Sequence, residues 1–394
     1  MISRSIHPFP ARMAPELALN ALKQLQKGST VLDPMVGSGT VLRHAVNLGH
    51  TGVGFDADPL AVLMSKSWTT DASAQVVRQE YEGLMRVVGK VDLRRDRLPW
   101  IAHHSETEEF IDYWFAKKQR KALTRLAFAL HERRHARLGA GRSAALDLLA
   151  VALSRIIITK DQGASLARDV SHSRPHKVAD DSTYDVFDGF RRSVETLLGR
   201  MTEKMPGKAE VRRGDARNIP LASETIDAVI TSPPYLNAID YMRGHRLSLV
   251  WLGYQVQELR RIRSESIGAE RAGQQNNNNI GRVSTAMFAG EGLPSRLQSM
   301  IHRYANDVFL MSSEIARVLK PGGIATLVVG NSCLRGSFVR NSDGVRMAGQ
   351  LAGLRVLSEI VRELPSSSRY LPLTSMGALS KRMRTETVLT FRKT

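Results

Sequence analysis

Short apolar runs rich in Val, Ile and Thr recur along the chain and stop abruptly at polar or turn-forming residues. Thr30–Leu32 ends at Asp33, Thr51–Phe55 ends at Asp56, and Ile226–Thr231 leads into Ser232-Pro233-Pro234. Runs of this length, composition and boundary are typical of buried strands. Three further strands are predicted later in the chain, at 324–329, 354–361 and 386–391.

Between these strands, apolar residues recur at three- and four-residue spacing, which predicts helices. The predicted helices that alternate with strands cover 15–25, 40–48, 59–68 and 304–319. Strands alternating with helices indicate an α/β fold, a doubly wound and mainly parallel sheet covered on both faces. The last two strands have no helix between them, so they are predicted to pair antiparallel, joined by the Pro- and Ser-rich segment 364–380.

The stretch 70–205 breaks this alternation and is predicted to be a helical insertion, with helices that include 106–137 and 144–159. A polar stretch at 268–294, dotted with Gly and Asn, is predicted to be a long loop within a second insertion at 255–297. The sequence therefore predicts three parts, at 1–69, 70–205 and 206–394, of which the first and third build the sheet.

The net charge of the chain indicates which class of partner it binds. Lys and Arg total 56 against 38 Asp and Glu, a formal net charge of +18 in 394 residues. A surface this basic attracts polyanions and favours nucleic acid as a partner over an acidic membrane. Nine of the basic residues fall within 117–142, beside a single acid, Glu132. This run fits a nucleic-acid contact surface and an ordinary solvated helix face equally well.

Cysteine usage and hydropathy narrow the class of protein further. Cys333 is the only cysteine, which excludes a disulfide framework and a cysteine-built zinc site. No apolar run is long enough to span a membrane, and residues 1–15 contain no apolar core of a secretory signal. We therefore expect a cytoplasmic location and no membrane partner.

The first strand leads into a Gly-rich turn and then a helix, in the order Asp33-Pro34-Met35-Val36-Gly37-Ser38-Gly39-Thr40. Glycines let the backbone approach a ligand closely, and the following helix offers free N–H groups. The turn is neither a P-loop nor a dinucleotide fingerprint. Asp56, at the end of the second strand, is placed to accept hydrogen bonds from ribose hydroxyls. Asp58 is predicted to cap the helix that begins at Pro59.

The second chemical motif is Ser232-Pro233-Pro234-Tyr235, directly after a strand. Each proline fixes φ near −65° and donates no hydrogen bond, so the turn is rigid. A serine hydroxyl and a proline carbonyl could together accept two hydrogen bonds from an exocyclic amino group, while Tyr235 stacks on the base. The alternative is a structural Pro-Pro turn with a core tyrosine.

Together these motifs resemble those of the S-adenosylmethionine-dependent amino-methyltransferases that act on DNA. The turn 33–40 resembles their cofactor motif, and 231–235 resembles their catalytic motif. The segment His7-Pro8-Phe9-Pro10-Ala11-Arg12 resembles the one that packs against the cofactor. Asp215, in Arg213-Gly214-Asp215-Ala216, resembles the strand-end acid near the cofactor adenine. The insertion 70–205 is not covered by these motifs.

The resemblance implies a Rossmann-like fold whose seven-stranded sheet has one antiparallel strand. It makes 1–69 the cofactor-binding half and 206–394 the catalytic half of one methyltransferase domain. It implies S-adenosyl-L-methionine as the cofactor, double-stranded DNA as the partner, and a cognate restriction endonuclease as an expected companion. The sequence does not indicate the oligomeric state. The cofactor-binding residues it implies are His7, Phe9, Pro10, Asp33, Pro34, Gly37, Gly39, Thr40, Asp56 and Asp215.

The target base follows from one position of the catalytic motif. Ser-Pro-Pro-Tyr is typical of enzymes that modify N4 of cytosine, whereas Asp or Asn in place of Ser232 is typical of adenine-N6 enzymes. Cytosine N4 is therefore favoured, and adenine N6 stays an alternative. An RNA or tRNA base N-methyltransferase and a non-catalytic DNA-binding subunit also stay open. Cytosine C5 chemistry is disfavoured, because it needs a cysteine nucleophile that follows a proline and Cys333 follows Ser332.

Basic side chains outside the motifs are candidates for contact with DNA. His7, His172 and His176 have no acidic or cysteine residue at the spacing of metal ligands, so no metal site is predicted. The helix after the catalytic turn is predicted to bury Leu247, Leu249 and Trp251. Its polar residues Arg243, His245 and Arg246 fit a place beside the target base and an ordinary charged surface equally well. The residues predicted to contact nucleic acid are Lys160, Arg174, His176, Arg243 and Arg246.

Overall fold

The chain folds as two compact units, the sheet unit and the helical unit. The sheet unit comprises Ala11–Ala57, Pro206–Ile239 and Arg263–Thr394. The helical unit comprises Met1–Pro10, Asp58–Met205 and Asp240–Ile262, and so takes in more of the chain than the insertion predicted at 70–205. The computed structural model describes residues 4–9, 12–136, 139–159, 161–168, 175–201, 205–236, 240–268, 277–290, 292–364 and 385–394.

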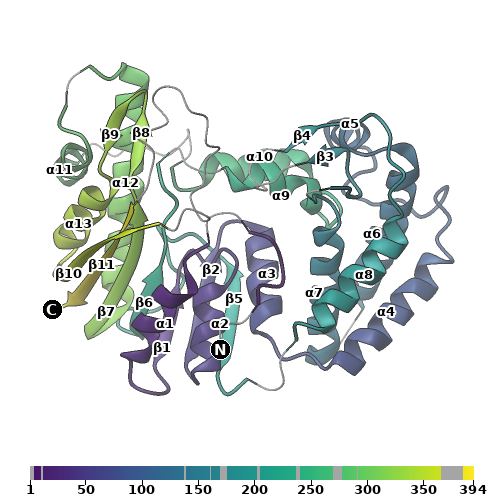
Figure 1. Cartoon of the computed structure of the whole chain (residues 1–394), viewed down its shortest axis with the longest axis horizontal. Helices are drawn as coiled ribbons and strands as arrows, with labels where there is room; N and C mark the ends of the chain where they lie inside the picture. The colour runs from purple at the N-terminus through teal and green to yellow at the C-terminus, as the bar shows by residue number, and fades with distance from the viewer. Residues whose placement is uncertain are drawn as a thin grey trace. The chain divides into compact units, whose positions relative to one another are not determined.

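The sheet unit contains the seven-stranded sheet, in the order β10-β11-β7-β6-β1-β2-β5 (Figure 1). The strands are β1 (Thr30–Asp33), β2 (Thr51–Asp56), β5 (Lys208–Arg213), β6 (Ile226–Thr231), β7 (Leu319–Gly330), β10 (Leu354–Glu363) and β11 (Thr385–Lys393). β11 pairs antiparallel with β10 and with β7, and every other pair in this sheet is parallel. The predicted fold class is confirmed, including the single antiparallel strand and the antiparallel pairing of the last two strands.

Helices cover both faces of this sheet. Val31 of β1 packs in one core with residues of α1 (Pro15–Lys23) and α2 (Thr40–Asn47). The next residue, Leu32, points to the opposite face, because side chains alternate along a strand. There it shares a core with α11 (Asn278–Met287), α12 (Ser295–Val318) and α13 (Asn341–Leu351). A short hairpin, β8 (Ser332–Leu334) and β9 (Ser337–Val339), follows β7.

The helical unit is built around α7 (Ala140–Arg155), whose residues 144–154 are all buried. A helix that is apolar nearly all round must be enclosed by its neighbours, and helices α3, α4, α6, α8 and α9 pack against it. The other helices of this unit are α3 (Pro59–Thr69), α4 (Ala74–Val88), α5 (Ser105–Trp114), α6 (Lys117–His135), α8 (Val186–Leu198), α9 (Tyr241–Leu249) and α10 (Val256–Glu265) as far as Ile262. A short strand pair, β3 (Ala167–Arg168) and β4 (His176–Lys177), belongs to the same unit.

Two of the predicted elements are wrong. The helix predicted at 106–137 is two helices, α5 and α6, because Phe115 and Ala116 adopt extended backbone conformations. The Phe115 side chain is buried and packs edge-on against Trp251. The loop predicted at 268–294 contains α11, which buries Ile280, Val283 and Met287. The connection predicted at 364–380 lies outside the described residues beyond Leu364.

Among the residues that the structure describes, none of the helices is both long and apolar enough to cross a membrane.

Candidate functional site

The cofactor-like and catalytic motifs meet at the carboxyl ends of two neighbouring strands, β1 and β6. These strands pair in parallel, with Leu32 opposite Val229. The Thr231 hydroxyl at the end of β6 donates to Asp33 Oδ1 at 2.7 Å, and both side chains are buried. Strand order reverses at this pair, with β2 and β5 on one side and β7 on the other. Open α/β sheets bind their ligands at such a switch point.

Asp33 has an unusual environment for a carboxylate. Burial raises its pKa to about 7, and the nearby Asp56 carboxylate acts in the same direction. Hydrogen bonds from Thr231 and from the Met35 N–H at 3.2 Å oppose the rise in pKa but do not cancel it. Asp33 is therefore poised to ionise when a positive group binds beside it.

The Gly-rich turn after β1 is fastened to the end of β2. Gly37 and Gly39 have φ values of 48° and 84°, in the left-handed region that glycine adopts without strain. The Gly37 N–H donates to Asp56 Oδ2 at 2.9 Å, and the Val36 N–H donates to the Phe55 carbonyl at 2.9 Å. Asp56 thus lies directly against the turn. Pro34 and Thr40, which complete the motif, are buried.

The segment Ser232–Tyr235 leaves β6 as a turn held by hydrogen bonds at several points. Ser232 is half-buried and shares a side-chain hydrogen bond with Tyr235. Burial raises the pKa of Tyr235 to about 12, so the phenol stays neutral at physiological pH. The buried Tyr304 hydroxyl of α12 donates to the Pro234 carbonyl at 2.8 Å. That contact occupies one of the carbonyls of the double-proline turn.

A second donor holds the far end of the same turn. The Ser332 hydroxyl, just after β7, donates to the Leu236 carbonyl at 2.7 Å. Ser332 itself accepts from the buried Asn341 amide, which also donates to the Gly330 carbonyl at 2.9 Å. Tyr304 and Ser332 were not predicted from the sequence. Ser332 carried a usable signal, because it is a polar residue at the carboxyl end of a strand, whereas Tyr304 occurs within an ordinary apolar helix pattern.

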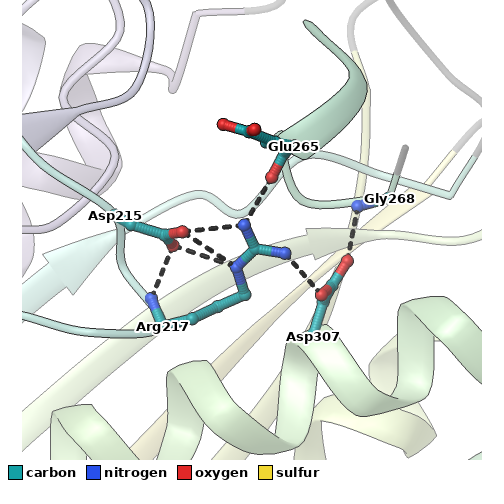
Figure 2. A network of polar contacts seen from close by, with 5 residues as sticks. All are labelled: Asp215, Arg217, Glu265, Gly268 and Asp307. Atoms are coloured by element: carbon teal, nitrogen blue, oxygen red, sulfur yellow. Dashed lines mark hydrogen bonds and ion pairs between the residues drawn. The ribbon is translucent and has the colours of Figure 1, made fainter. Parts of the chain in front are cut away.

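Asp215 lies in the turn after β5, and its carboxylate is engaged by Arg217 (Figure 2). The Arg217 guanidinium reaches Asp215 Oδ2 at 2.7 Å and also Asp307 Oδ1 of α12 at 2.7 Å. It donates further to the Glu265 carbonyl, while the Gly268 N–H donates to Asp307 Oδ2 at 2.9 Å. The network joins the turn after β5 to α12 and to the residues between Glu265 and Gly268, all within the sheet unit.

This network includes two groups whose pKa is shifted, Arg217 and Asp307. Burial opposes the positive charge of Arg217, but the carboxylates of Asp215 and Asp307 outweigh it and raise the pKa of Arg217. Burial also raises the pKa of Asp307 despite the hydrogen bonds from Gly268 and Arg217. Any ligand group that binds Asp215 would therefore share that carboxylate with Arg217. Asp215 was singled out from the sequence, whereas its network partners Arg217 and Asp307 were not. The role predicted for Asp215 toward a cofactor stays a prediction.

The N-terminal segment contributes to the helical unit. The His7 ring, which is buried, makes hydrogen bonds to the Ser154 hydroxyl at 2.9 Å and to the Pro8 carbonyl at 2.6 Å. Phe9 stacks on Tyr241 with ring centroids 5.1 Å apart. Pro10 lies outside the described residues. The roles predicted for these three residues toward a cofactor stay predictions.

Asp58 caps α3 as predicted, with its Oδ1 accepting from the Leu60 N–H at 2.8 Å. Its other oxygen bonds to Nδ1 of His245, which is buried. Burial alone would raise the pKa of Asp58, but His245 and the helix N–H groups hold it below its usual value. His245 therefore supports α3 from within the core, so it is not an ordinary surface charge. Its predicted place beside the target base stays a prediction. Leu247, Leu249 and Trp251 are buried, as predicted.

The residues predicted to contact nucleic acid have mixed environments. His176 in β4 is exposed. Arg243 is exposed and lies 3.7 Å from Asp240, whereas Arg246 lies over the Phe110 ring at 5.1 Å. Lys160 and Arg174 lie outside the described residues. Within the described ranges, no group of three or more His, Cys, Asp or Glu side chains could hold a metal ion.

Comparison with curated proteins gives two relatives that are named as methyltransferases. The chain is 24% identical over 306 residues to the Type II methyltransferase M.BsoBI of Geobacillus stearothermophilus, covering 67% of this chain and 56% of that protein. It is 22% identical over 278 residues to the Type II methyltransferase M.MvaI of Kocuria varians, covering 66% of this chain and 60% of that protein. The chain thus spans less than two thirds of the length of either relative. No protein-family model matches it.

Solved structures similar to this chain include two methyltransferases. One is a SAM-dependent methyltransferase from Methanosarcina mazei, 9% identical, with a TM-score of 0.35 over 97% of this chain and 98% of that one. The other is a putative DNA modification methylase from Thermus thermophilus in complex with S-adenosyl-L-methionine, 14% identical, with a TM-score of 0.25 over 46% of this chain and 51% of that one.

Proposed function

We propose that this chain is an S-adenosylmethionine-dependent DNA methyltransferase that methylates the exocyclic N4 of cytosine. One observation carries the proposal: the Gly-rich turn and the Ser-Pro-Pro-Tyr turn begin at adjacent strand ends, joined by the hydrogen bond from Thr231 to Asp33. The two relatives named as Type II methyltransferases support the same class of reaction. The net charge of +18 supports DNA as the substrate.

The residues around the Gly-rich turn fit the proposed cofactor. The turn has no side chain at Gly37 and Gly39, which lets a ligand approach the backbone at these two positions. The carboxylates of Asp33 and Asp56 suit a cationic group and ribose hydroxyls respectively. Asp215 would accept from the adenine amino group while it remains paired with Arg217. The bound cofactor supplies an electrophilic methyl group on a sulfonium ion.

The catalytic turn would hold the base. Ser232 and the Pro233 carbonyl would accept hydrogen bonds from the amino group of a flipped-out base, which biases the nitrogen lone pair toward the methyl donor. Tyr235 would stack on the base, an interaction worth ~1–3 kcal/mol. The hydrogen bonds from Tyr304 and Ser332 keep this turn in one conformation, so little reorganisation is needed at the moment of transfer. The proton leaves afterwards, to Ser232 or to water.

Ser232 favours cytosine N4 over adenine N6, and an RNA base is the second alternative. Purified protein should transfer radiolabelled methyl from S-adenosylmethionine to duplex DNA. Digestion of the product to nucleosides should give N4-methylcytidine in its deoxy form. N6-methyladenine in the digest would show that adenine is the target instead of cytosine. Incorporation of methyl into RNA alone would show that RNA is the substrate instead of DNA. Failure to bind S-adenosylmethionine in calorimetry would favour a non-catalytic subunit. A companion restriction endonuclease stays a prediction.

Cofactor affinity should depend on the ionisation of Asp33, whose pKa is about 7 in the cofactor-free protein. Below this pH the carboxyl must lose a proton to face a positive group, so affinity should fall by about tenfold or more between pH 7.5 and pH 5.5. Titration calorimetry in two buffers of different ionisation enthalpy should detect the released proton. The Asp33→Asn variant should bind more weakly, with no such pH dependence. If the cofactor affinity of the wild-type protein is as independent of pH as that of this variant, the proposed role of Asp33 is contradicted.

A further inference from the structure

The structure separates the basic residues at 117–142 into two kinds. Arg133 and Arg142 both pair with the buried Glu80, Arg134 pairs with the buried Asp147 at 2.7 Å, and Arg120 pairs with Asp112. These four cations stabilise the helical unit internally, and Arg137 lies outside the described residues. The other four are exposed and, in the part of the chain that the structure describes, form no ion pair: Lys117, Lys118, Lys121 and Arg125. We call these four the α6 basic stripe.

The stripe occupies one side of α6. At 100° per residue, its four positions fall within about 100° of the helix circumference, and 117 to 125 span ~12 Å along the axis. The opposite side of the helix is the buried one, formed by Gln119, Leu123, Leu126, Ala127 and Leu130. The stripe is therefore a continuous line of positive charge on a helix whose opposite side is buried in the core of the helical unit.

Within the described ranges, no acid forms an ion pair with this line of charge. Asp112 is taken by Arg120, and Asp180 pairs with Lys177 at 2.7 Å. The acid within α6, Glu132, lies almost two turns beyond Arg125. An exposed tyrosine, Tyr113, precedes the stripe, and its ring lies 5.1 Å from the Lys177 ammonium. The surface at the start of α6 is thus basic and carries a planar ring.

We propose that the α6 basic stripe binds the phosphate backbone of duplex DNA, an inference that rests on the proposed function. Along one strand of duplex DNA a phosphate occurs every 3.4 Å of helix axis, so ~12 Å spans about three or four phosphates. Lysine is a flexible point charge, suited to contact with phosphate and poorly suited to bidentate reading of a base. The stripe therefore contributes affinity and register without contributing sequence preference.

The test compares two full-length variants with the same loss of charge. The stripe variant carries Lys117→Gln, Lys118→Gln, Lys121→Gln and Arg125→Gln. The control variant carries Lys23→Gln, Lys27→Gln, Arg78→Gln and Lys90→Gln, at exposed positions that form no ion pair among the described residues. DNA affinity is measured by fluorescence anisotropy from 50 to 200 mM salt, on duplexes with and without methylatable sites.

For the stripe variant we expect the slope of log affinity against log salt to fall by about 3, since each lost phosphate contact removes about 0.9. Affinity at low salt should drop by at least about tenfold on both duplexes, while cofactor binding stays as in the wild-type protein. Equal slopes in the two variants would overturn the proposal, as would loss of binding to phosphatidylserine vesicles with DNA binding unchanged. Because binding is scored separately from methyl transfer, a wild-type protein that binds DNA without methylating it contradicts the proposed function and not the stripe.

Discussion

Replacing Ser232 by alanine should lower the rate of methyl transfer by about 10²–10³-fold, the range expected when a positioned hydrogen-bonding group is lost from the reacting centre. The Ser232 hydroxyl would accept from the amino group that attacks the methyl, so its loss removes an interaction made at the reacting nitrogen. The half-buried position of Ser232, directly after β6 and in hydrogen-bond contact with Tyr235, supports this role.

The loss should fall on kcat and leave cofactor binding almost unchanged. Asp33 and Asp56 end β1 and β2, Gly37 lies in the turn after β1, and all three keep their own contacts without Ser232. Single-turnover transfer of radiolabelled methyl measures the first quantity, and calorimetry with S-adenosylmethionine measures the second. Ser313→Ala is the matched control, because its hydroxyl donates to the Phe309 carbonyl one turn back in α12, at 2.9 Å. A Ser232→Ala protein as fast as Ser313→Ala would remove Ser232 from the mechanism.

The sheet and the meeting of its two sequence motifs could be predicted from the sequence because both depend on local patterns. The run Ile226–Thr231 gave the bounds of β6, and Asp33 and Asp56 marked the ends of β1 and β2. Parallel strands bring their carboxyl ends to one edge of a sheet, so motifs almost 200 residues apart are expected to meet there. The hydrogen bond from Thr231 to Asp33 shows that the two motifs do meet at this edge.

Features that depend on tertiary contacts could not be predicted in this way. The chain leaves helical conformation at Phe115 without a Gly or Pro nearby, and the buried contact of this ring with Trp251 has no signal in local sequence. α11 was missed because its Asn-rich start resembles a loop, although Asn277 uses its side chain to cap the Asn279 N–H at 3.0 Å. Tyr304 was missed for a similar reason, since a core tyrosine is identified as a hydrogen-bond donor only when its acceptor is known.

The contacts of Asp215 with its network also depend on tertiary structure and were not predicted. Of the substitutions considered, the loss of Arg217 from this network is expected to lower the free energy of unfolding most. Arg217 and Asp307 are 90 residues apart in sequence, and the Asp307 side chain is completely buried. Arg217→Met should leave this carboxylate without its cation. Breaking a buried ion pair by removing one partner costs about 3–5 kcal/mol, and we expect about 3 kcal/mol because 16% of the Arg217 side chain is exposed.

The loss of stability in Arg217→Met should shrink in the double variant Arg217→Met/Asp307→Asn. A neutral amide at 307 removes the unpaired charge, and its oxygen can still accept from the Gly268 N–H. The loss should also shrink at acid pH. Burial already raises the pKa of Asp307, and without Arg217 it rises further, so lowering the pH protonates Asp307 in the folded variant and relieves the penalty. Urea unfolding of the wild-type protein, the two single variants Arg217→Met and Asp307→Asn, and the double variant at pH 7 and pH 5 measures both effects. Additive losses in the double variant, with no dependence on pH, would show that Asp307 gains nothing from Arg217 and that the network in Figure 2 contributes no coupling energy.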